Sequence, residues 1–141
     1  MLLTIQKEIH ITASPTLVYD AITDPNKIVS YYPIEAVRSD NQVGGQIIFE
    51  GKIGEAPFTD YGVIEVFDRP REFKYSYWSD NHGTARLPEN HMSIQYLLSG
   101  NEDGTRLILE HANLLTEERR AKMAGIWDYL LTQLKSYVER T

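Results

Sequence analysis

The last stretch of the chain, GIWDYLLTQLKSYVERT (residues 125–141), belongs to the segment whose pattern decides the fold. Apolar residues recur there at spacings of three and four, which is typical of an amphipathic helix. The apolar positions are Met123, Trp127, Leu130, Leu134, and Tyr137 or Val138. Thr116 is a suitable N-cap, and the helix dipole favours Glu117 and Glu118 in the first turn. The pattern predicts one helix of about 25 residues, roughly 37 Å long, whose apolar face needs a partner.

The N-terminal segment predicts one strand followed by two short helices. Residues 3–12 alternate between apolar and polar side chains, as in a half-buried strand, and Lys7 interrupts the apolar side. We expect the stem of Lys7 to lie along the last helix with its charge in water. Ser14-Pro15 and Asp24-Pro25 each combine a helix cap with proline at the first helical position. The second helix should end near residues 31–33.

In residues 34–113, short turn-forming segments alternate with runs of strand length, as is typical of an antiparallel sheet. Turn-forming segments at 41–45, 51–57, 68–70, 81–90 and 100–104 separate runs of strand length, which predicts six further strands. Three runs alternate cleanly, with apolar or aromatic side chains on one face of the sheet. The residues on this face are Phe73, Tyr75, Tyr77, Met92, Ile94, Tyr96, Leu107, Leu109 and His111. The long segment from Ser79 to Asn90 is expected to be a loop, and its role stays open.

A single sheet with one apolar face must bury that face, and the C-terminal helix is the main element that can cover it. We therefore predict an α+β helix-grip fold, START-like and birch-pollen-allergen-like, as a single domain over residues 1–141. A curved antiparallel sheet of about seven strands would wrap the last helix, with two short helices after the first strand. Trp127 and its neighbours on the helix should face the sheet. The expected facing sets are Met123, Trp127, Leu130 and Leu134 on the helix, and Tyr75, Ile94, Tyr96 and Leu109 on the sheet.

Composition excludes several classes of function. The sequence has no cysteine, which removes disulfide, iron–sulfur, thiolate-zinc and cysteine-nucleophile chemistry. A net charge of -6 and scattered basic residues argue against nucleic-acid binding. No run of apolar residues is long enough for membrane insertion, and the N-terminus does not have the pattern of a signal peptide. We expect a cytoplasmic protein that has no bound cofactor and no metal.

Five segments together resemble a known family. They are ITASPTLVYDAITDP (11–25), YY (31–32), GVIEVFDRPREFKYSYW (62–78), GTRLILEHANL (104–114) and GIWDYLLTQL (125–134). In order and spacing they resemble the activator of heat-shock-protein-90 ATPase homologue-like branch of the START-like, or SRPBCC, superfamily. The resemblance implies a hydrophobic ligand cavity under the last helix and no fixed chemistry. Relatives often have tryptophan where this chain has YY, so the mouth of the cavity is expected to be lined differently.

The candidate ligand-binding residues lie on the predicted inner face of the sheet and on the last helix. They are Tyr61, Tyr75, Tyr77, Met92, Ile94, Tyr96, Leu109, His111, Met123 and Trp127. Tyrosine hydroxyls and an indole N–H need hydrogen-bond partners when buried, so this group favours a cavity with polar points over a plain core. Both interpretations of His111 stay open: a group that orients a ligand, or a histidine satisfied by its neighbours. His82 and His91 have no third metal ligand at suitable spacing, and we identify no catalytic pair.

Three functions remain open at this stage. The first is binding of a hydrophobic small molecule, such as a lipid, polyketide or aromatic compound. The second is an enzyme of the cyclase or hydrolase type in the same cavity. The third is an interaction module that regulates a chaperone ATPase, with chaperone or homodimer contacts. The chaperone link is secondary, because the eukaryotic activators that the chain resembles carry a further domain for that contact.

Overall fold

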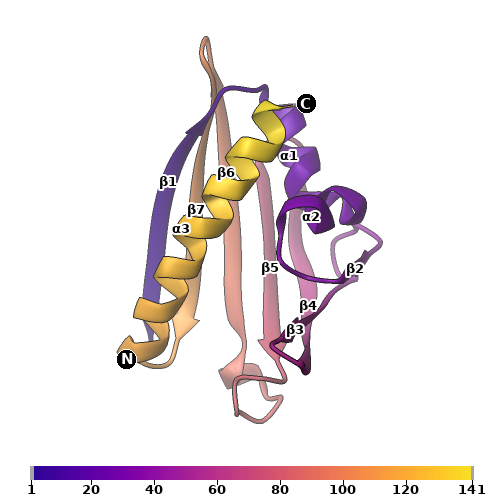
Figure 1. The fold of residues 1–141 in the computed structure, drawn as a ribbon, viewed down its shortest axis with the longest axis vertical. Helices are drawn as coiled ribbons and strands as arrows, with labels where there is room; N and C mark the ends of the chain where they lie inside the picture. The colour runs from indigo at the N-terminus through magenta and orange to yellow at the C-terminus, as the bar shows by residue number, and fades with distance from the viewer. Residues whose placement is uncertain (1, 141) are drawn as a thin grey trace.

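The computed structural model describes residues 2–140 and contains one antiparallel sheet of seven strands (Figure 1). The strand order is β1-β7-β6-β5-β4-β3-β2. The strands are β1 (Leu3–Ile11), β2 (Ala36–Ser39), β3 (Gln46–Ile53), β4 (Ala56–Asp68), β5 (Glu72–Ser79), β6 (Met92–Asn101) and β7 (Gly104–Leu114). Consecutive strands from β2 to β7 are neighbours, and β1 pairs with β7 at the other edge. The predicted strand count and order of elements are confirmed.

Three α-helices complete the fold, each with a side-chain cap at its start. Helices α1 (Pro15–Thr23) and α2 (Pro25–Tyr31) begin with proline after the caps Ser14 and Asp24. Helix α3 (Glu117–Glu139) begins after Thr116, whose hydroxyl accepts a hydrogen bond from the Arg119 N–H at 3.1 Å. A short 3-10 helix, η1 (Pro88–Asn90), lies in the loop between β5 and β6. No helix among residues 2–140 is long and apolar enough to cross a membrane.

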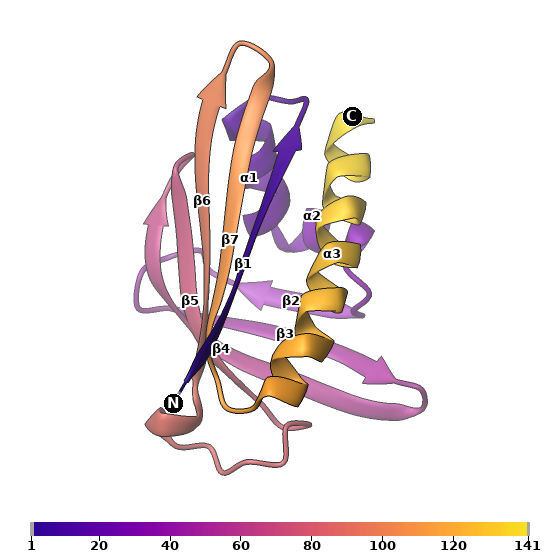
Figure 2. The same ribbon diagram turned by 90° about the vertical axis from the view of Figure 1, so that its left-hand side faces the viewer.

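The sheet curves strongly, and α3 runs diagonally along its concave side (Figure 2). The hairpin of β3 and β4 extends beneath α3, while α1 and α2 lie near the C-terminal half of α3. Trp127 is only 1% exposed and packs edge-on against Tyr96 at 6.1 Å between ring centroids. The helix therefore buries its apolar face against the sheet, as the sequence predicts. The buried residues of α3 are Trp127, Leu130, Leu131, Leu134 and Val138.

Two details of the sequence interpretation change in the structure. The expected turn at 51–57 is much shorter, because Gly51–Ile53 pair with Ala56–Phe58 and leave only Gly54 and Glu55 at the tip. Gly54 has φ +63, a conformation that glycine adopts without a Cβ penalty. Lys7 does lie against α3, but its ammonium forms an ion pair with Asp128 at 3.0 Å. The first change is a local hairpin pairing, whereas the second joins two segments that are far apart in the sequence.

Candidate functional site

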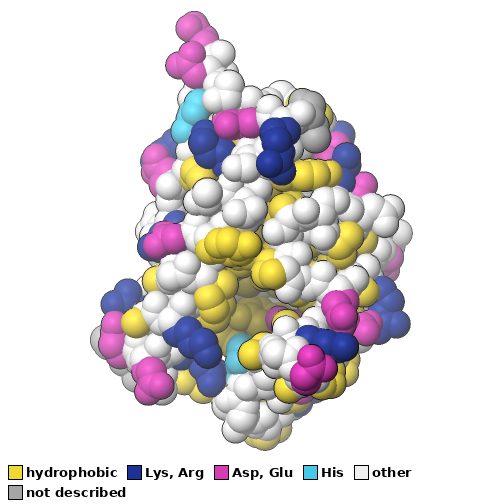
Figure 3. Space-filling view, viewed as in Figure 1, with side chains coloured by type: hydrophobic (Ala, Val, Ile, Leu, Met, Phe, Trp, Pro, Cys, Tyr) yellow, Lys and Arg dark blue, Asp and Glu magenta, His cyan; other side chains and the backbone are white. Residues whose placement is uncertain are grey.

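A cavity of about 640 Å³ lies between α3, the concave side of the sheet and the segment after α2 (Figure 3). The space-filling view shows a hollow lined with hydrophobic side chains and open to solvent, with basic and histidine side chains at its edge. Most of its wall is aromatic or aliphatic. The apolar lining residues are Tyr32, Pro33, Ile34, Phe49, Ile53, Phe58, Tyr75, Tyr77, Ile94, Met123, Ile126, Trp127, Tyr129 and Leu130.

The aromatic part of the wall is a continuous series of ring contacts. Tyr32, which follows α2, stacks on Phe49 of β3 with 6.0 Å between centroids. Phe49 contacts Tyr75 of β5 at 5.7 Å, and Tyr75 contacts Tyr77 at 6.2 Å. These rings meet because alternate residues of each strand point to the same face of the sheet. At the mouth, Ile53 and other apolar lining residues are exposed to solvent.

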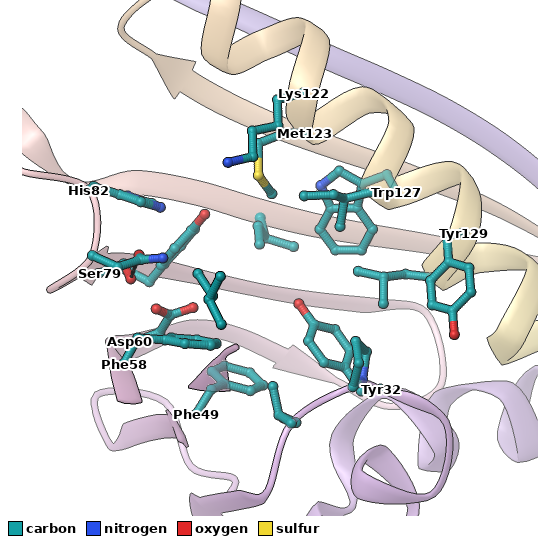
Figure 4. Close-up of a pocket in the computed structure, with 18 of the residues that line it drawn as sticks. Tyr32, Phe49, Phe58, Asp60, Ser79, His82, Lys122, Met123, Trp127 and Tyr129 are labelled. Carbon is teal, nitrogen blue, oxygen red and sulfur yellow. Dashed lines mark hydrogen bonds between the residues drawn. The ribbon is translucent and has the colours of Figure 1, made fainter. Parts of the chain in front are cut away.

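The lining also has polar side chains: Lys52, Asp60, Ser79, Asn81, His82 and Lys122. Those of Asp60, Ser79 and His82 form a polar end of the cavity. Figure 4 shows the Asp60 carboxylate on the same side of the cavity as Ser79 and His82, with Lys122 of α3 across from them. The cavity therefore combines a large apolar wall with a small group of hydrogen-bonding side chains, as ligand-binding pockets do.

Asp60 is the most unusual residue of this polar end. Burial raises the pKa of its carboxyl to about 6; the hydrogen bond that the nearby Ser79 hydroxyl is able to offer would lower that pKa in part, and the charge of Asp80 raises it. Asp60 Oδ1 is buried without a hydrogen-bond partner among the described residues. The Ser79 hydroxyl has one hydrogen, and in this structure it donates that hydrogen to Asn81 Oδ1 at 2.5 Å. The Asp60 carboxyl thus keeps unused hydrogen-bonding capacity beside the cavity.

His111 lies behind the cavity wall, held by two of the residues that form the wall. The Trp127 indole N–H donates to His111 Nδ1 at 2.9 Å, so the proton of the neutral imidazole must be on Nε2. His111 Nε2 lies 3.1 Å from the Tyr77 hydroxyl and donates to it. Burial lowers the pKa of His111 to about 4, with a smaller contribution from His82. His111 is fully buried and uses both ring nitrogens, so it fixes Tyr77 and Trp127 in the wall.

His82 belongs to the β5–β6 loop and does line the cavity. Its ring packs edge-on against Tyr77 at 6.2 Å, and its carbonyl accepts a hydrogen bond from Arg119 at 2.9 Å. Burial, followed by the charges of Arg119 and Lys122, lowers the pKa of His82 to about 4. His91 instead donates a hydrogen bond from its ring Nδ1 to the Leu87 carbonyl oxygen at 2.8 Å. Within residues 2–140 no three histidine or carboxylate side chains are grouped as metal ligands.

The structure brings together only part of the predicted ligand-binding set. Five of the candidates line the cavity: Tyr75, Tyr77, Ile94, Met123 and Trp127. Four others are buried in the core around it: Met92, Tyr96, Leu109 and His111. Whether any of them contacts a ligand stays a prediction.

The expectation that Tyr61 points inward is wrong. Tyr61 lies on the outer face of the sheet, where it stacks on Trp78 at 6.2 Å and carries the Arg86 guanidinium 4.2 Å above its ring. A shift of one residue exchanges the two faces of a strand, and in β4 the inward residue is Asp60. Phe58 lines the cavity, and Gly62 and Ile64 are buried on the same face of β4. Because alternate residues of a strand share a face, Asp60 must also point inward. Asp60 is missing from the predicted ligand-binding set because inward strand positions are usually apolar.

The chain has clear similarity to known proteins. A sequence model of the family described as Activator of Hsp90 ATPase homolog 1-like protein matches residues 12–139. The solution structure of ChR145 from Cytophaga hutchinsonii is 28% identical, with a TM-score of 0.84 over 98% of this chain and 94% of that chain. CalU16 from Micromonospora echinospora is 26% identical, with a TM-score of 0.73 over 97% of this chain and 75% of that chain.

A further similar structure is that of the Aha1 dimer from Colwellia psychrerythraea. It is 18% identical, with a TM-score of 0.78 over 97% of this chain and 96% of that chain, and the likeness is therefore one of fold. Curated proteins give no match.

Proposed function

Because this chain belongs to the family of activator of Hsp90 ATPase homolog 1-like proteins and holds an open cavity beneath α3, we propose that it binds a hydrophobic small molecule. The observation that carries the proposal is the cavity itself. At about 640 Å³ it lies within the range of about 300–1,000 Å³ that is usual for small-molecule sites. Its aromatic wall suits a lipid, polyketide or aromatic compound.

Binding without turnover accounts best for the polar groups around the cavity. A catalytic acid–base pair needs two titratable groups within hydrogen-bond reach of the reacting atoms. The two ring nitrogens of His111 are occupied by Tyr77 and Trp127, and no hydrogen bond or ion pair joins Asp60 to His82 or Lys122 within residues 2–140. These groups support a role in orienting a ligand. Turnover of a bound compound would instead favour an enzyme of the cyclase or hydrolase type.

A second candidate is an interaction module, either as a homodimer or on a chaperone ATPase. The family name and the likeness to the Aha1 dimer from Colwellia psychrerythraea favour it. Leu17 of α1 and Val29 of α2 are exposed apolar residues outside the cavity lining. Light scattering during gel filtration would show a homodimer, and Leu17→Ser should then shift the mass toward the monomer. A monomer at all concentrations would remove the homodimer form of this candidate.

The direct test of the binding proposal uses Trp127 as an internal reporter. The chain has two tryptophans, and Trp78 lies on the outer face of the sheet, so Trp78→Phe leaves Trp127 as the single indole. Titration with fatty acids, flavonoid-like aromatics and polyketides should produce a saturable change of Trp127 emission with at least one class. Native mass spectrometry of freshly purified protein should identify any compound that remains bound.

Gly125 offers a matched pair of control variants. It lines the cavity on α3, and a Cβ at this position meets no atom within 4 Å. Gly125→Phe should fill the mouth and abolish the emission change, whereas the small side chain of Gly125→Ala should leave it intact. The two variants are matched because both remove the same helix-weakening glycine. If no compound class changes the emission and no compound co-purifies, binding of a small molecule is wrong and the interaction module becomes the better hypothesis.

A further inference from the structure

The apolar cavity contains one anomaly, the unpaired carboxylate oxygen of Asp60. Among the described residues, Asp60 Oδ1 is the only buried side-chain oxygen or nitrogen that lacks a hydrogen-bond partner. Buried polar groups are hydrogen-bonded in most proteins, and an unpaired one destabilises the fold. Asp60 also lines the cavity, so a ligand there can donate a hydrogen bond to the part of this unpaired carboxyl group that faces it.

The strand register explains why the protein itself does not supply that donor. Asp60 of β4 stands opposite Phe49 of β3 on one side and Ser79 of β5 on the other. Phe49 has no side-chain donor, and the Ser79 hydroxyl donates to Asn81 Oδ1. Neither Lys52 nor Lys122, which also line the cavity, forms an ion pair with Asp60 in the described part of the chain. The inward carboxylate is thus left facing the cavity.

We infer, building on the proposed function, that the ligand is a hydroxylated apolar compound, an alcohol or phenol, whose neutral hydroxyl group donates a hydrogen bond to Asp60. The rest of such a molecule would lie against the aromatic wall formed by Tyr32, Phe49 and Tyr75, which are joined by ring contacts. Figure 4 shows Asp60 beside Phe58, with Tyr32 and Phe49 farther along the same wall. The hydroxyl group would then lie at the polar end of the cavity, and the hydrocarbon rings would lie along its aromatic wall.

The charges that line the cavity favour a neutral donor over a charged one. At neutral pH Asp60 is largely ionised, because its pKa of about 6 lies below that pH, so its oxygens only accept. His82 is uncharged there, since burial and the charges of Arg119 and Lys122 hold its pKa near 4. A carboxylate has no hydrogen to donate to Asp60 and is repelled by its charge, although Lys52 and Lys122 attract it. A cationic amine is attracted by Asp60 but repelled by Lys52 and Lys122. A neutral hydroxyl group can donate to Asp60 without either repulsion.

The test compares probes that differ only in the group presented to Asp60. Two ring sizes cover the cavity: naphthol with naphthalene, and hydroxypyrene with pyrene. Pyrenemethylamine and pyrenecarboxylate supply the cationic and anionic versions of the same ring system. Dissociation constants are measured by calorimetry or probe fluorescence at neutral pH. Since hydrogen bonds to charged groups are stronger than neutral ones, the hydroxylated probe should bind about tenfold or more tightly than its parent hydrocarbon.

Two variants of Asp60 and one control assign that preference to the carboxylate. Asp60→Asn keeps the size of the side chain but removes the charge, and should reduce the preference to about threefold or less. Asp60→Leu removes the acceptor entirely, should abolish the preference, and should keep binding of the parent hydrocarbons. Glu8→Gln removes the same charge from the outer face of β1, where Glu8 pairs with Arg106 at 2.8 Å, and should retain the wild-type preference.

The possible results separate this inference from the proposed function. Loss of the hydroxyl preference in both Asp60 variants, with hydrocarbon binding retained, supports the inference. Equal binding of hydroxylated and parent probes by the wild-type protein, or a preference that survives in Asp60→Leu, overturns it and leaves the binding function intact. Tightest binding of pyrenemethylamine or pyrenecarboxylate overturns the neutral hydroxyl in particular. If the wild-type protein binds none of the probes on either ring system, the inference fails, while the proposed function is decided separately by the titration with fatty acids, flavonoid-like aromatics and polyketides.

Discussion

Replacing Asp60 by asparagine should change how the stability of the protein depends on pH. Burial raises the pKa of the Asp60 carboxyl from 3.8 to about 6. The folded protein therefore keeps the proton over a pH range in which the unfolded chain has already lost it. The free energy of unfolding should fall as the pH rises between these two values, because ionised Asp60 is less favourable in the fold than in water. Above the higher value this contribution is constant.

The size of the effect follows from the difference between the two pKa values. The difference between 3.8 and about 6 corresponds to about 3 kcal/mol, since each tenfold change in an equilibrium is about 1.4 kcal/mol. Hydration of the open cavity reduces this, so about 1–3 kcal/mol is expected. The Asp60→Asn variant lacks the contribution. Relative to the wild-type protein it should gain that amount of stability between about pH 4 and neutral pH.

The assay is urea unfolding of both proteins at a series of pH values, with the difference in unfolding free energy plotted against pH. Any constant effect of the amide group cancels in the slope of that plot. Glu8→Gln is a control with the opposite sign, because the hydrogen bond from Arg106 lowers the pKa of Glu8. That variant should become less stable relative to the wild-type protein as the pH rises toward 4.5, the ordinary pKa of the Glu8 carboxyl, and the difference should be constant above it. A difference for Asp60→Asn that stays flat across this range would refute the view that Asp60 is a buried, unpaired carboxyl.

Three other predictions concern the residues that shape the cavity and the ends of the sheet. Trp127→Phe should lower the unfolding free energy by about 1–3 kcal/mol, because it leaves the buried His111 Nδ1 without its donor; unchanged stability in urea would contradict this pairing. Gly104→Ala should lower the unfolding free energy by about 1–3 kcal/mol or more, since Gly104 has φ +134 and its Cβ would lie 2.3 Å from the Ile11 carbonyl oxygen. Gly125→Ala should instead raise the unfolding free energy by about 0.5–1 kcal/mol, because the site is helical and open; a loss of stability there would contradict the placement of Gly125.

The sequence by itself determined the elements of this protein and their order. Proline after Ser14 and Asp24 marks the starts of two helices, because a capping side chain and a fixed φ act within a few residues. Alternation with a period of two marks the strands, and the spacing of Trp127 and Leu130 marks one face of the last helix. These signals are local, so they can be read without knowing which segments meet. The need to bury one apolar face of the sheet then predicts that α3 covers it.

Only the tertiary structure decided which of those inward residues line a cavity and which are plain core. His111 and Tyr96 lie on the same face as Tyr75, yet they are sealed behind Trp127, because the diagonal path of α3 covers one part of the concave sheet and leaves another open. Asp60 gains its importance only from the strands beside it, which bury its carboxylate without pairing it. Cavity shape and the pKa of a buried acid depend on residues brought together from the whole chain, and local patterns do not contain that information.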